Sequence, residues 1–264
     1  MGYKQYIKEG TCIWCQRNSP RVTFRNEPHI IPESLGGTEI GFDICDDCNR
    51  YFGSANKNEP NTNLIFKEMF GAIRAFSCTP TPDTYKNLSS VYFEYRYKTN
   101  TIKIKSRFSI SVITRQFKRS LYEVFLQKYH YQTGKGLDCK MDNVRNYARW
   151  NKGNLRVYYV YNKVILTSTG KDALFLPMSD GAISDIDDYG FFPFWFMGHY
   201  FLLEIIPSKA QLADFLYLQK NANQLIIPAT GEERLMELTD IRQVDFFMER
   251  FGKKHIDVNE KLNR

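Results

Sequence analysis

Four cysteines near the amino terminus have the spacing of a metal site. They form two Cys-x-x-Cys pairs, Cys12 with Cys15 and Cys45 with Cys48. A pair of this spacing lets two thiolates reach one ion from a tight turn, and two pairs complete the tetrahedron that zinc prefers. Such a site has no open coordination position. We therefore expect a structural zinc that fixes the ends of the 29-residue segment between the pairs.

The competing interpretation of these cysteines is a set of disulfides. Disulfides are typical of secreted proteins, and the amino terminus from Met1 to Lys8 has no apolar core of signal-peptide length. We therefore favour zinc and expect a soluble, cytoplasmic protein. Cys78 and Cys139 lie outside the pairs, and we interpret them as buried thiols rather than ligands.

The segment between the pairs contains one histidine, at the start of the run HIIPESLGG over residues 29–37. A neutral imidazole accepts a proton near pH 7, so His29 is a candidate general base. The alternative is a structural histidine that is hydrogen-bonded within the loop. The glycine pair, Gly36 and Gly37, permits a tight turn and the close approach of a nucleic-acid backbone, or simply marks the loop.

The order and spacing of these motifs resemble the zinc-anchored HNH endonucleases. The resemblance rests on the first Cys-x-x-Cys, the HIIPESLGG run, the sequence ICDDCN that includes the second pair, and the Phe-Gly that follows it. It covers about residues 10–55, a fifth of the chain. It implies a ββα-metal fold, in which a β-hairpin and the next helix hold a catalytic divalent ion, magnesium or manganese.

Carried over by position, the resemblance implies roles for two residues. His29 corresponds to the general base that activates water for attack on a phosphodiester, and Asn49 to the helix residue that ligates the catalytic ion. The implied products carry a 5′-phosphate and a 3′-hydroxyl. Asparagine is also favoured at helix starts, so Asn49 is alternatively a cap of the helix that follows Cys48.

One position departs from the family pattern. Many relatives carry a metal ligand directly before the base, where this chain has Pro28, whose side chain cannot ligate. Glu27 and Glu33 are candidates to supply the missing carboxylate, and Asp43 and Asp46 are more distant ones. The alternative for each is an acidic residue without a metal role.

The elements that must position these residues indicate an α+β fold. Residues 1–60 have little helical periodicity, many turn-forming residues and both cysteine pairs, which predicts a small metal-stabilised module. The resemblance implies that this module is a zinc-stabilised ββα-metal (HNH) module, and we expect a larger mixed α+β domain after it. We expect helices at 63–76, 114–131 (stopped by Gly134), 141–150, 212–218 and 244–251. We expect strands at 91–97, 101–113, 156–167 as a hairpin, 191–207 as a buried pair, and 224–228.

Composition shifts divide the chain into three parts. We expect the HNH module at residues 1–60 and a helix with a Pro-rich linker at residues 61–84. We expect a basic α+β domain, for substrate binding or sensing, at residues 85–264. The run TPTPD over residues 79–83 cannot continue a helix and marks the boundary. The most hydrophobic window, 191–207, is interrupted and too short to span a membrane.

The net charge of +7 arises outside the cysteine segment. Residues 85–264 carry 27 Lys/Arg against 19 Asp/Glu, whereas residues 1–60 carry seven against eight. A basic surface suits nucleic acid, and we expect double-stranded DNA as the partner, with a second copy of the chain or a companion protein as a further one. The candidate nucleic-acid-binding residues are Lys103, Lys105, Arg107, Arg145 and Arg149, and the alternative is an ordinary solvated face.

Two functional hypotheses follow. The first is a metal-dependent HNH endonuclease that hydrolyses phosphodiester bonds of DNA, with a role in bacterial or phage defence or restriction. The second is a catalytically inactive, zinc-containing nucleic-acid-binding or regulatory protein, for which Pro28 is the best support. A regulatory role of residues 85–264, with the nuclease as its effector, extends the first hypothesis.

Overall fold

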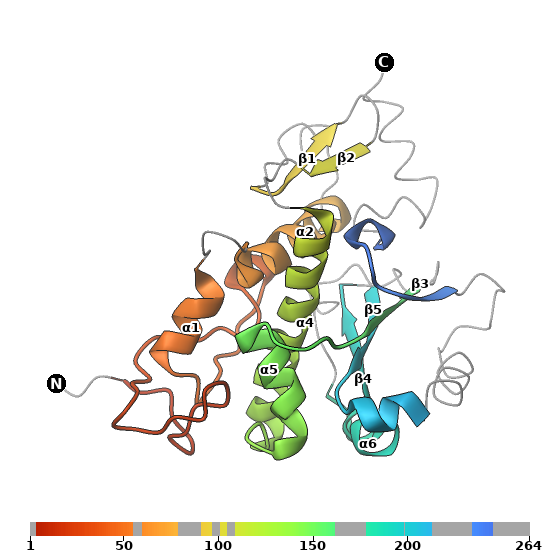
Figure 1. Ribbon diagram of the computed structural model, residues 1–264. Coiled ribbons are helices and arrows are strands. Elements are labelled where there is room, and N and C mark those ends of the chain that lie inside the picture. The colour runs from red at the N-terminus through yellow and green to blue at the C-terminus, as the bar shows by residue number, and fades with distance from the viewer. Residues whose placement is uncertain are drawn as a thin grey trace.

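The computed structural model describes residues 4–54, 60–78, 91–96, 101–104, 109–161, 178–197, 199–212 and 234–244. A cysteine-containing segment at the N-terminal end is followed by helices that pack against a four-stranded antiparallel sheet (Figure 1). The expected mixed α+β class is confirmed. Among the described helices, none is long and apolar enough to cross a membrane.

Helix α4, Ile110–Thr133, is the central element (Figure 1). The Ser109 hydroxyl caps its start by accepting a hydrogen bond from the Val112 N–H, and Gly134, in the left-handed conformation with φ 70°, ends it. Every residue from Gln116 to His130 is buried. A helix buried on all its faces must be enclosed by other elements, and here α2 (Thr62–Cys78), α5 (Asp142–Trp150) and the sheet enclose it.

The sheet has the strand order β4-β5-β3-β6, with every neighbouring pair antiparallel. The strands are β3 (Val157–Tyr161), β4 (Phe191–Phe196), β5 (His199–Glu204) and β6 (Arg234–Glu237). Strands β4 and β5 confirm the buried pair predicted at 191–207. Strand β3 confirms the first half of the hairpin predicted at 156–167, and its second half lies outside the described residues.

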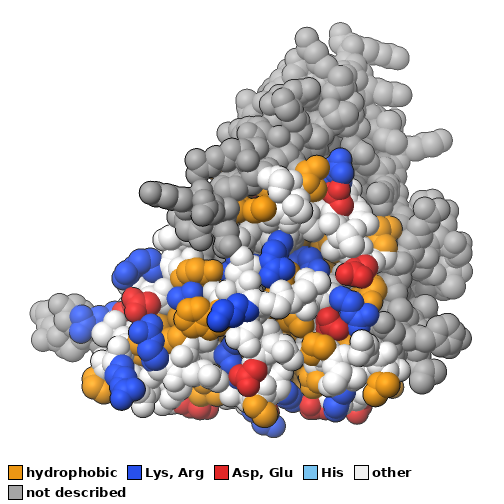
Figure 2. Space-filling view, in the orientation of Figure 1, with side chains coloured by type: hydrophobic (Ala, Val, Ile, Leu, Met, Phe, Trp, Pro, Cys, Tyr) orange, Lys and Arg blue, Asp and Glu red, His pale blue; other side chains and the backbone are white. Residues whose placement is uncertain are grey.

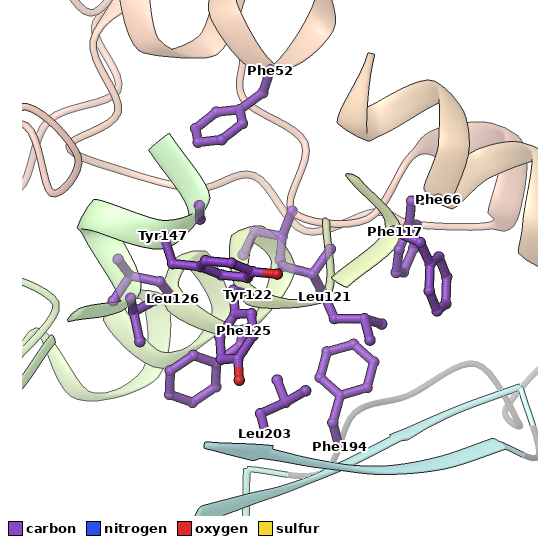
Figure 3. Packing of buried hydrophobic residues seen from close by; sticks show 14 of the residues in the cluster. Phe52, Phe66, Phe117, Leu121, Tyr122, Phe125, Leu126, Tyr147, Phe194 and Leu203 are labelled. Carbon is purple, nitrogen blue, oxygen red and sulfur yellow. The ribbon is translucent and has the colours of Figure 1, made fainter. Parts of the chain in front are cut away.

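The hydrophobic core lies between α4 and the sheet. Figure 3 shows Leu121 and Phe125 of α4 directed toward Phe194 and Leu203 of the sheet. Aromatic rings continue the packing toward α2, where Phe70 lies edge-on to Phe196 and tilted against Phe117, at centroid distances of 4.7 and 5.8 Å. Burial of these rings stabilises the packing of the helices on the sheet.

The remaining helices and strands mostly agree with the sequence prediction. They are α1 (Asp46–Gly53), α2 (Thr62–Cys78), β1 (Phe93–Arg96), β2 (Thr101–Ile104), α5 (Asp142–Trp150) and α6 (Asp180–Tyr189). Short 3₁₀ turns lie at Glu33–Leu35, Cys139–Met141 and Ile241–Gln243. The predicted helices at 63–76, 114–131 and 141–150 are therefore confirmed. Residues 213–218, 224–228 and 245–251 lie outside the described part of the chain.

The strand predicted at 101–113 is wrong in its second half. Strand β2 ends at Ile104, residues 105–108 lie outside the described part, and α4 begins at Ile110. The alternation of apolar residues at 108, 110 and 112 favours a strand, but Ser109 caps a helix start and Ile113 begins the stripe that packs into the core. Tertiary packing therefore overrides the local pattern.

Candidate metal centre and active site

The four paired cysteines meet at one point. The sulfur atoms of Cys12, Cys15, Cys45 and Cys48 all lie within 4.8 Å of one another, and those of Cys15 and Cys45 are 3.7 Å apart. Tetrahedral zinc with bonds of about 2.3 Å requires sulfur atoms about 3.8 Å apart. Cys12, Cys45 and Cys48 are buried and Cys15 is half-buried. The set is therefore consistent with the structural zinc that the sequence predicted.

Two tight turns bring the sulfur atoms together. In the first, the Gln16 N–H donates to the Cys12 carbonyl at 2.8 Å, and Gln16 adopts a left-handed φ of 57°. In the second, Cys45 precedes α1 and donates its N–H to the Cys12 sulfur at 3.4 Å. Cys48 lies in the first turn of α1, where the helix dipole favours a thiolate.

Hydrogen bonds among the four sulfur atoms lower the pKa of two of the cysteine thiols and raise the pKa of the other two. The bonds with Cys12 and Cys45 lower the pKa of the Cys15 thiol, and Arg17, whose Nε lies 3.4 Å from that sulfur, lowers it further. The bond with Cys12 lowers the pKa of Cys45 to about 7. Bonds with neighbouring sulfurs raise the pKa of Cys12 and Cys48. Metal binding to this set therefore competes with protons.

Asp43 and Asp46, the more distant candidates for the missing carboxylate ligand, have structural roles. The buried Asp46 carboxylate accepts hydrogen bonds from the Thr23 hydroxyl and from the N–H groups of Arg25 and Asn26, both at 2.8 Å. Burial opposes ionisation of Asp46, but these bonds outweigh it, so its pKa is lowered. Both residues use their carboxylates within the fold, so neither is available to an ion beside His29.

His29 lies on the first arm of a short hairpin. His29 and Ile40 form an isolated antiparallel bridge, and backbone bonds from Ile30 to Glu39 and from Gly41 to Pro28 flank it at 3.1 and 2.8 Å. The arms are joined through the turn at Glu33–Leu35, and α1 follows the second arm. This is the ββα order that the sequence predicted, with a single bridge in place of two long strands.

The glycine pair serves this turn. Gly36 has a left-handed φ of 93°, and its N–H donates to the Glu33 carbonyl at 2.7 Å. A Cβ on Gly37 would lie 2.0 Å from the carbonyl oxygen of Ile31. The close approach that Gly37 permits in this structure is therefore to the hairpin's own backbone.

The His29 ring lies at the protein surface and not in its interior. Its side chain is 29% exposed, and Nε2 lies 3.5 Å from Oε1 of Glu33, whose side chain is 75% exposed. The other ring nitrogen, Nδ1, is buried and has no hydrogen-bond partner among the described residues. Solvent therefore reaches the ring, and the carboxylate that faces its Nε2 is that of Glu33.

Asn49 and Glu27, the two other residues predicted for the catalytic site, form no hydrogen bond or ion pair with the His29 ring within the described residues. Asn49 is the fourth residue of α1, whose cap is Cys45, so Asn49 does not cap the helix. Its half-buried side chain forms no hydrogen bond within the described residues. Glu27 is exposed, and the buried Pro28 separates it from His29.

Comparison with protein families gives a match to the HNH endonucleases over residues 12–64. Residues 12–64 form an HNH endonuclease domain. The matched part contains both cysteine pairs, the His29 hairpin, α1 and the start of α2. The HNH domain thus extends nine residues beyond the resemblance seen in the sequence. Comparison of the whole chain with curated proteins and with solved structures gives no match.

The HNH domain offers few protein ligands for the catalytic ion that its family implies. Of the predicted ligands, Asn49 would offer an amide oxygen and Glu33 a carboxylate, which are donor types that magnesium and manganese bind. In the described parts of the chain, the four cysteines are the only group of three or more His, Cys, Asp or Glu ligands. These residues suit a hard ion that keeps most of its positions for water and substrate oxygens.

Helix α4 holds the HNH hairpin through contacts that the sequence analysis missed. The Lys128 ammonium pairs with the Glu39 carboxylate on the second arm. His130 Nε2 lies 3.0 Å from Oδ2 of Asp43, and the Gly136 N–H donates to His130 Nδ1, so Nε2 carries the proton. Asp43 also accepts three backbone N–H groups just before Cys12. No local pattern marks these pairs, because each joins residues more than 80 positions apart.

The predicted nucleic-acid-binding residues have different surroundings. Arg145 is 3% exposed, and its guanidinium donates to the carbonyls of Gly136 and Asp138 and to the Asp142 carboxylate. The prediction that Arg145 binds nucleic acid is therefore corrected, because its donors close the loop between α4 and α5. Arg149 is half-buried beside the metal centre, where its Nε donates to the Cys48 sulfur at 3.3 Å.

The remaining predicted binding residues belong to or follow strand β2. The backbone of Lys103 pairs with Glu94 of β1, and its side chain is outside the described part. Lys105 and Arg107 lie outside the described residues altogether. Cys139, expected to be a buried thiol, is exposed in the turn before α5, and the side chain of Cys78 is outside the described part.

Proposed function

We propose that this protein is a metal-dependent endonuclease that hydrolyses phosphodiester bonds of DNA. The observation that carries the proposal is the partly exposed His29 ring on a ββα hairpin within the matched HNH segment. The structural cysteine centre fixes both ends of that segment. A role in bacterial or phage defence or restriction is part of the proposal and rests on the resemblance to such nucleases.

In the proposed reaction His29 accepts a proton from the attacking water. Nε2 is the ring atom suited to this task, because Nδ1 is buried. The Glu33 carboxylate, 3.5 Å from Nε2, stabilises the imidazolium that forms once Nε2 has taken the proton. Asn49 and Glu33 would hold the divalent ion, which stabilises negative charge on the phosphate when bound.

The test is cleavage of supercoiled plasmid with magnesium or manganese. His29→Ala should lower the rate by about 10²- to 10⁴-fold, the usual contribution of a positioned base. Glu33→Gln should lower it more than Glu27→Gln does, because only Glu33 faces the ring. Equal cleavage by the wild type and His29→Ala would remove His29 from the mechanism.

The second candidate function is a catalytically inactive nucleic-acid-binding protein. It is favoured by Pro28, and by the fact that no group of three His, Asp or Glu ligands surrounds His29 in the described residues. This candidate predicts DNA binding without cleavage under any divalent ion. The same plasmid assay, run beside a binding measurement, separates the two functions.

A further inference from the structure

An arginine lies over two aromatic rings at the edge of the metal centre. The Arg149 guanidinium carbon lies 3.8 Å from the centroid of the Tyr51 ring and 4.3 Å from that of Trp150. Its Nε donates to the Cys48 sulfur, and the Tyr51 hydroxyl accepts a hydrogen bond from Arg119 at 2.6 Å. The three side chains form a fixed stack, which we call the Tyr51–Arg149–Trp150 stack.

One edge of the Arg149 guanidinium has hydrogen-bond donors without a partner in the described residues. The two terminal nitrogens of Arg149, Nη1 and Nη2, form no hydrogen bond within the described residues, although the side chain is half-buried. A guanidinium held by stacking loses little freedom when its free edge binds a phosphate, because its orientation is already fixed. This edge therefore suits an oxygen anion such as a phosphodiester.

The stack also ends in an exposed aromatic ring. Trp150 is 45% exposed, whereas most large apolar side chains in the described residues are buried. An exposed indole at the end of a cation–aromatic stack offers a flat face to another ring. Nucleic-acid bases bind such faces, and each stacked base contributes about 1–3 kcal/mol.

Two further arginines lie at the metal centre and on α1. Arg17 donates to the Cys15 sulfur, and its side chain is 48% exposed. Arg50 of α1 is 68% exposed, and Asp47 between them lies 3.4 Å from Arg17 and 3.9 Å from Arg50. Figure 2 shows Lys and Arg side chains spread over the face formed by α1 and α5, with fewer Asp and Glu among them.

We propose that the Tyr51–Arg149–Trp150 stack is a binding site for single-stranded DNA. Arg149 binds a backbone phosphate, and Trp150 stacks on an adjacent base. A base exposes its face only when it is unpaired, so the site prefers single-stranded or locally opened DNA to a closed duplex. The inference deepens the proposed function by naming the form of the substrate, and it rests on that function. Arg149 and Trp150 lie outside the matched HNH segment.

The experiment measures binding without cleavage. The protein carries His29→Ala and is titrated with an oligothymidylate of about 12 nucleotides and with a duplex of equal length, while tryptophan emission is recorded. Trp14 is buried and Trp195 is half-buried, so the strand should quench chiefly Trp150. Trp150→Ala should remove most of the quenching and weaken strand binding by about 5- to 100-fold, with a smaller effect on the duplex.

Arg149→Gln should weaken binding to both DNA forms and reduce the salt dependence of binding by about one phosphate contact. Its zinc content is measured as well, because Arg149 also contacts Cys48. The matched control is Lys140→Gln, which removes a positive charge at the opposite end of α5, where Lys140 pairs with Asp187, and which should bind like the parent.

Equal affinity and equal quenching for the parent and Trp150→Ala would overturn the inference. Equal losses of affinity for the strand and for the duplex in Trp150→Ala would also overturn it, because stacking requires an unpaired base. Binding is measured in the His29→Ala background and does not depend on cleavage. Absence of cleavage by the wild type would therefore contradict the proposed function, and the binding titrations would still test the single-strand site.

Discussion

At the scale of single residues, the site depends on positions where only one side chain fits. Gly37 is the clearest case, because its missing Cβ lets the turn after His29 fold back on the Ile31 carbonyl. Asp46 is another, since its carboxylate satisfies a hydroxyl and two backbone N–H groups at once. These residues do no chemistry, but they set where the imidazole lies.

Gly37→Ala should destabilise the hairpin. The added methyl would lie 2.0 Å from a backbone oxygen, so the turn must open, at a cost of about 1–3 kcal/mol in the free energy of unfolding. Urea unfolding measures the change. Gly53→Ala is the control, because a Cβ there meets nothing within 4 Å, and its free energy of unfolding should stay within about 0.5 kcal/mol. Equal stability of both variants would show that the turn relaxes freely.

At the scale of elements, α4 organises the molecule. It contacts the HNH hairpin through Lys128 and His130, α5 through Arg119, and the start of α2 through Glu123. Glu123 is buried, with an exposed fraction of 3%, and the Thr62 hydroxyl donates a hydrogen bond to its carboxylate at 3.0 Å. Burial raises the pKa of Glu123 to about 8, against the lowering effect of its hydrogen bonds and of Arg119.

This carboxyl should make stability depend on pH. The folded pKa lies above the unfolded value of 4.5, so the folded chain binds the proton more tightly. The contribution of protonated Glu123 to the free energy of unfolding is fully present below about pH 4.5, and it is lost as the pH rises toward 8. The loss approaches about 1.4 kcal/mol per pH unit within that window.

Glu123→Gln should remove this slope, because the amide does not ionise. Urea unfolding of the wild type and of Glu123→Gln at several pH values between about 5 and 8 measures the difference in their free energies of unfolding. Taking this difference cancels the titration of other groups. The variant should gain relative stability as the pH rises. A constant difference across the range would contradict the raised pKa of Glu123.

At the scale of the whole molecule, the HNH domain and the sheet share one hydrophobic core. The cluster of buried side chains runs from Trp14 and Phe52 in the HNH domain through Phe70 of α2 to Phe201 of β5. The buried pair of Asp43 and His130 adds a polar tie between the HNH domain and α4. The division at 61–84 into separate parts stays a prediction.

Removal of zinc should therefore affect the entire described fold. Chelation removes the cation that links the four cysteine sulfurs, so the cysteine turns should open and the thermal transition should shift to lower temperature as one step. Cys12→Ser should act in the same way. The loaded protein should contain about one zinc per chain.

Cys139→Ser is the matched control for this experiment, because Cys139 is exposed and outside the cluster. It should leave the zinc content and the transition temperature unchanged. Two separate transitions after chelation would show that the HNH domain unfolds alone, and an unchanged transition would contradict the four-cysteine site.

Much of this arrangement could be predicted from local patterns. The cysteine spacing predicted the metal centre, helical periodicity predicted α2 and α5, and alternation predicted the β4–β5 pair. The strand expected to continue to residue 113 was wrong, because residues 110–113 fit either period until the core selects one. Arg145 was assigned to nucleic acid, because a sequence does not show that two backbone carbonyls and a carboxylate will enclose an arginine.

The sequence by itself determined the chemical types at the site: four thiolates spaced for one ion, a lone imidazole between them, and a proline where a ligand is usual. These follow from local spacing, and spacing along the chain limits what nearby side chains can reach. Only the tertiary structure decided that Glu33 faces His29, that α4 holds the hairpin, and that Arg149 lies over two aromatic rings. Such contacts join distant segments, and the packing of the whole core sets their positions.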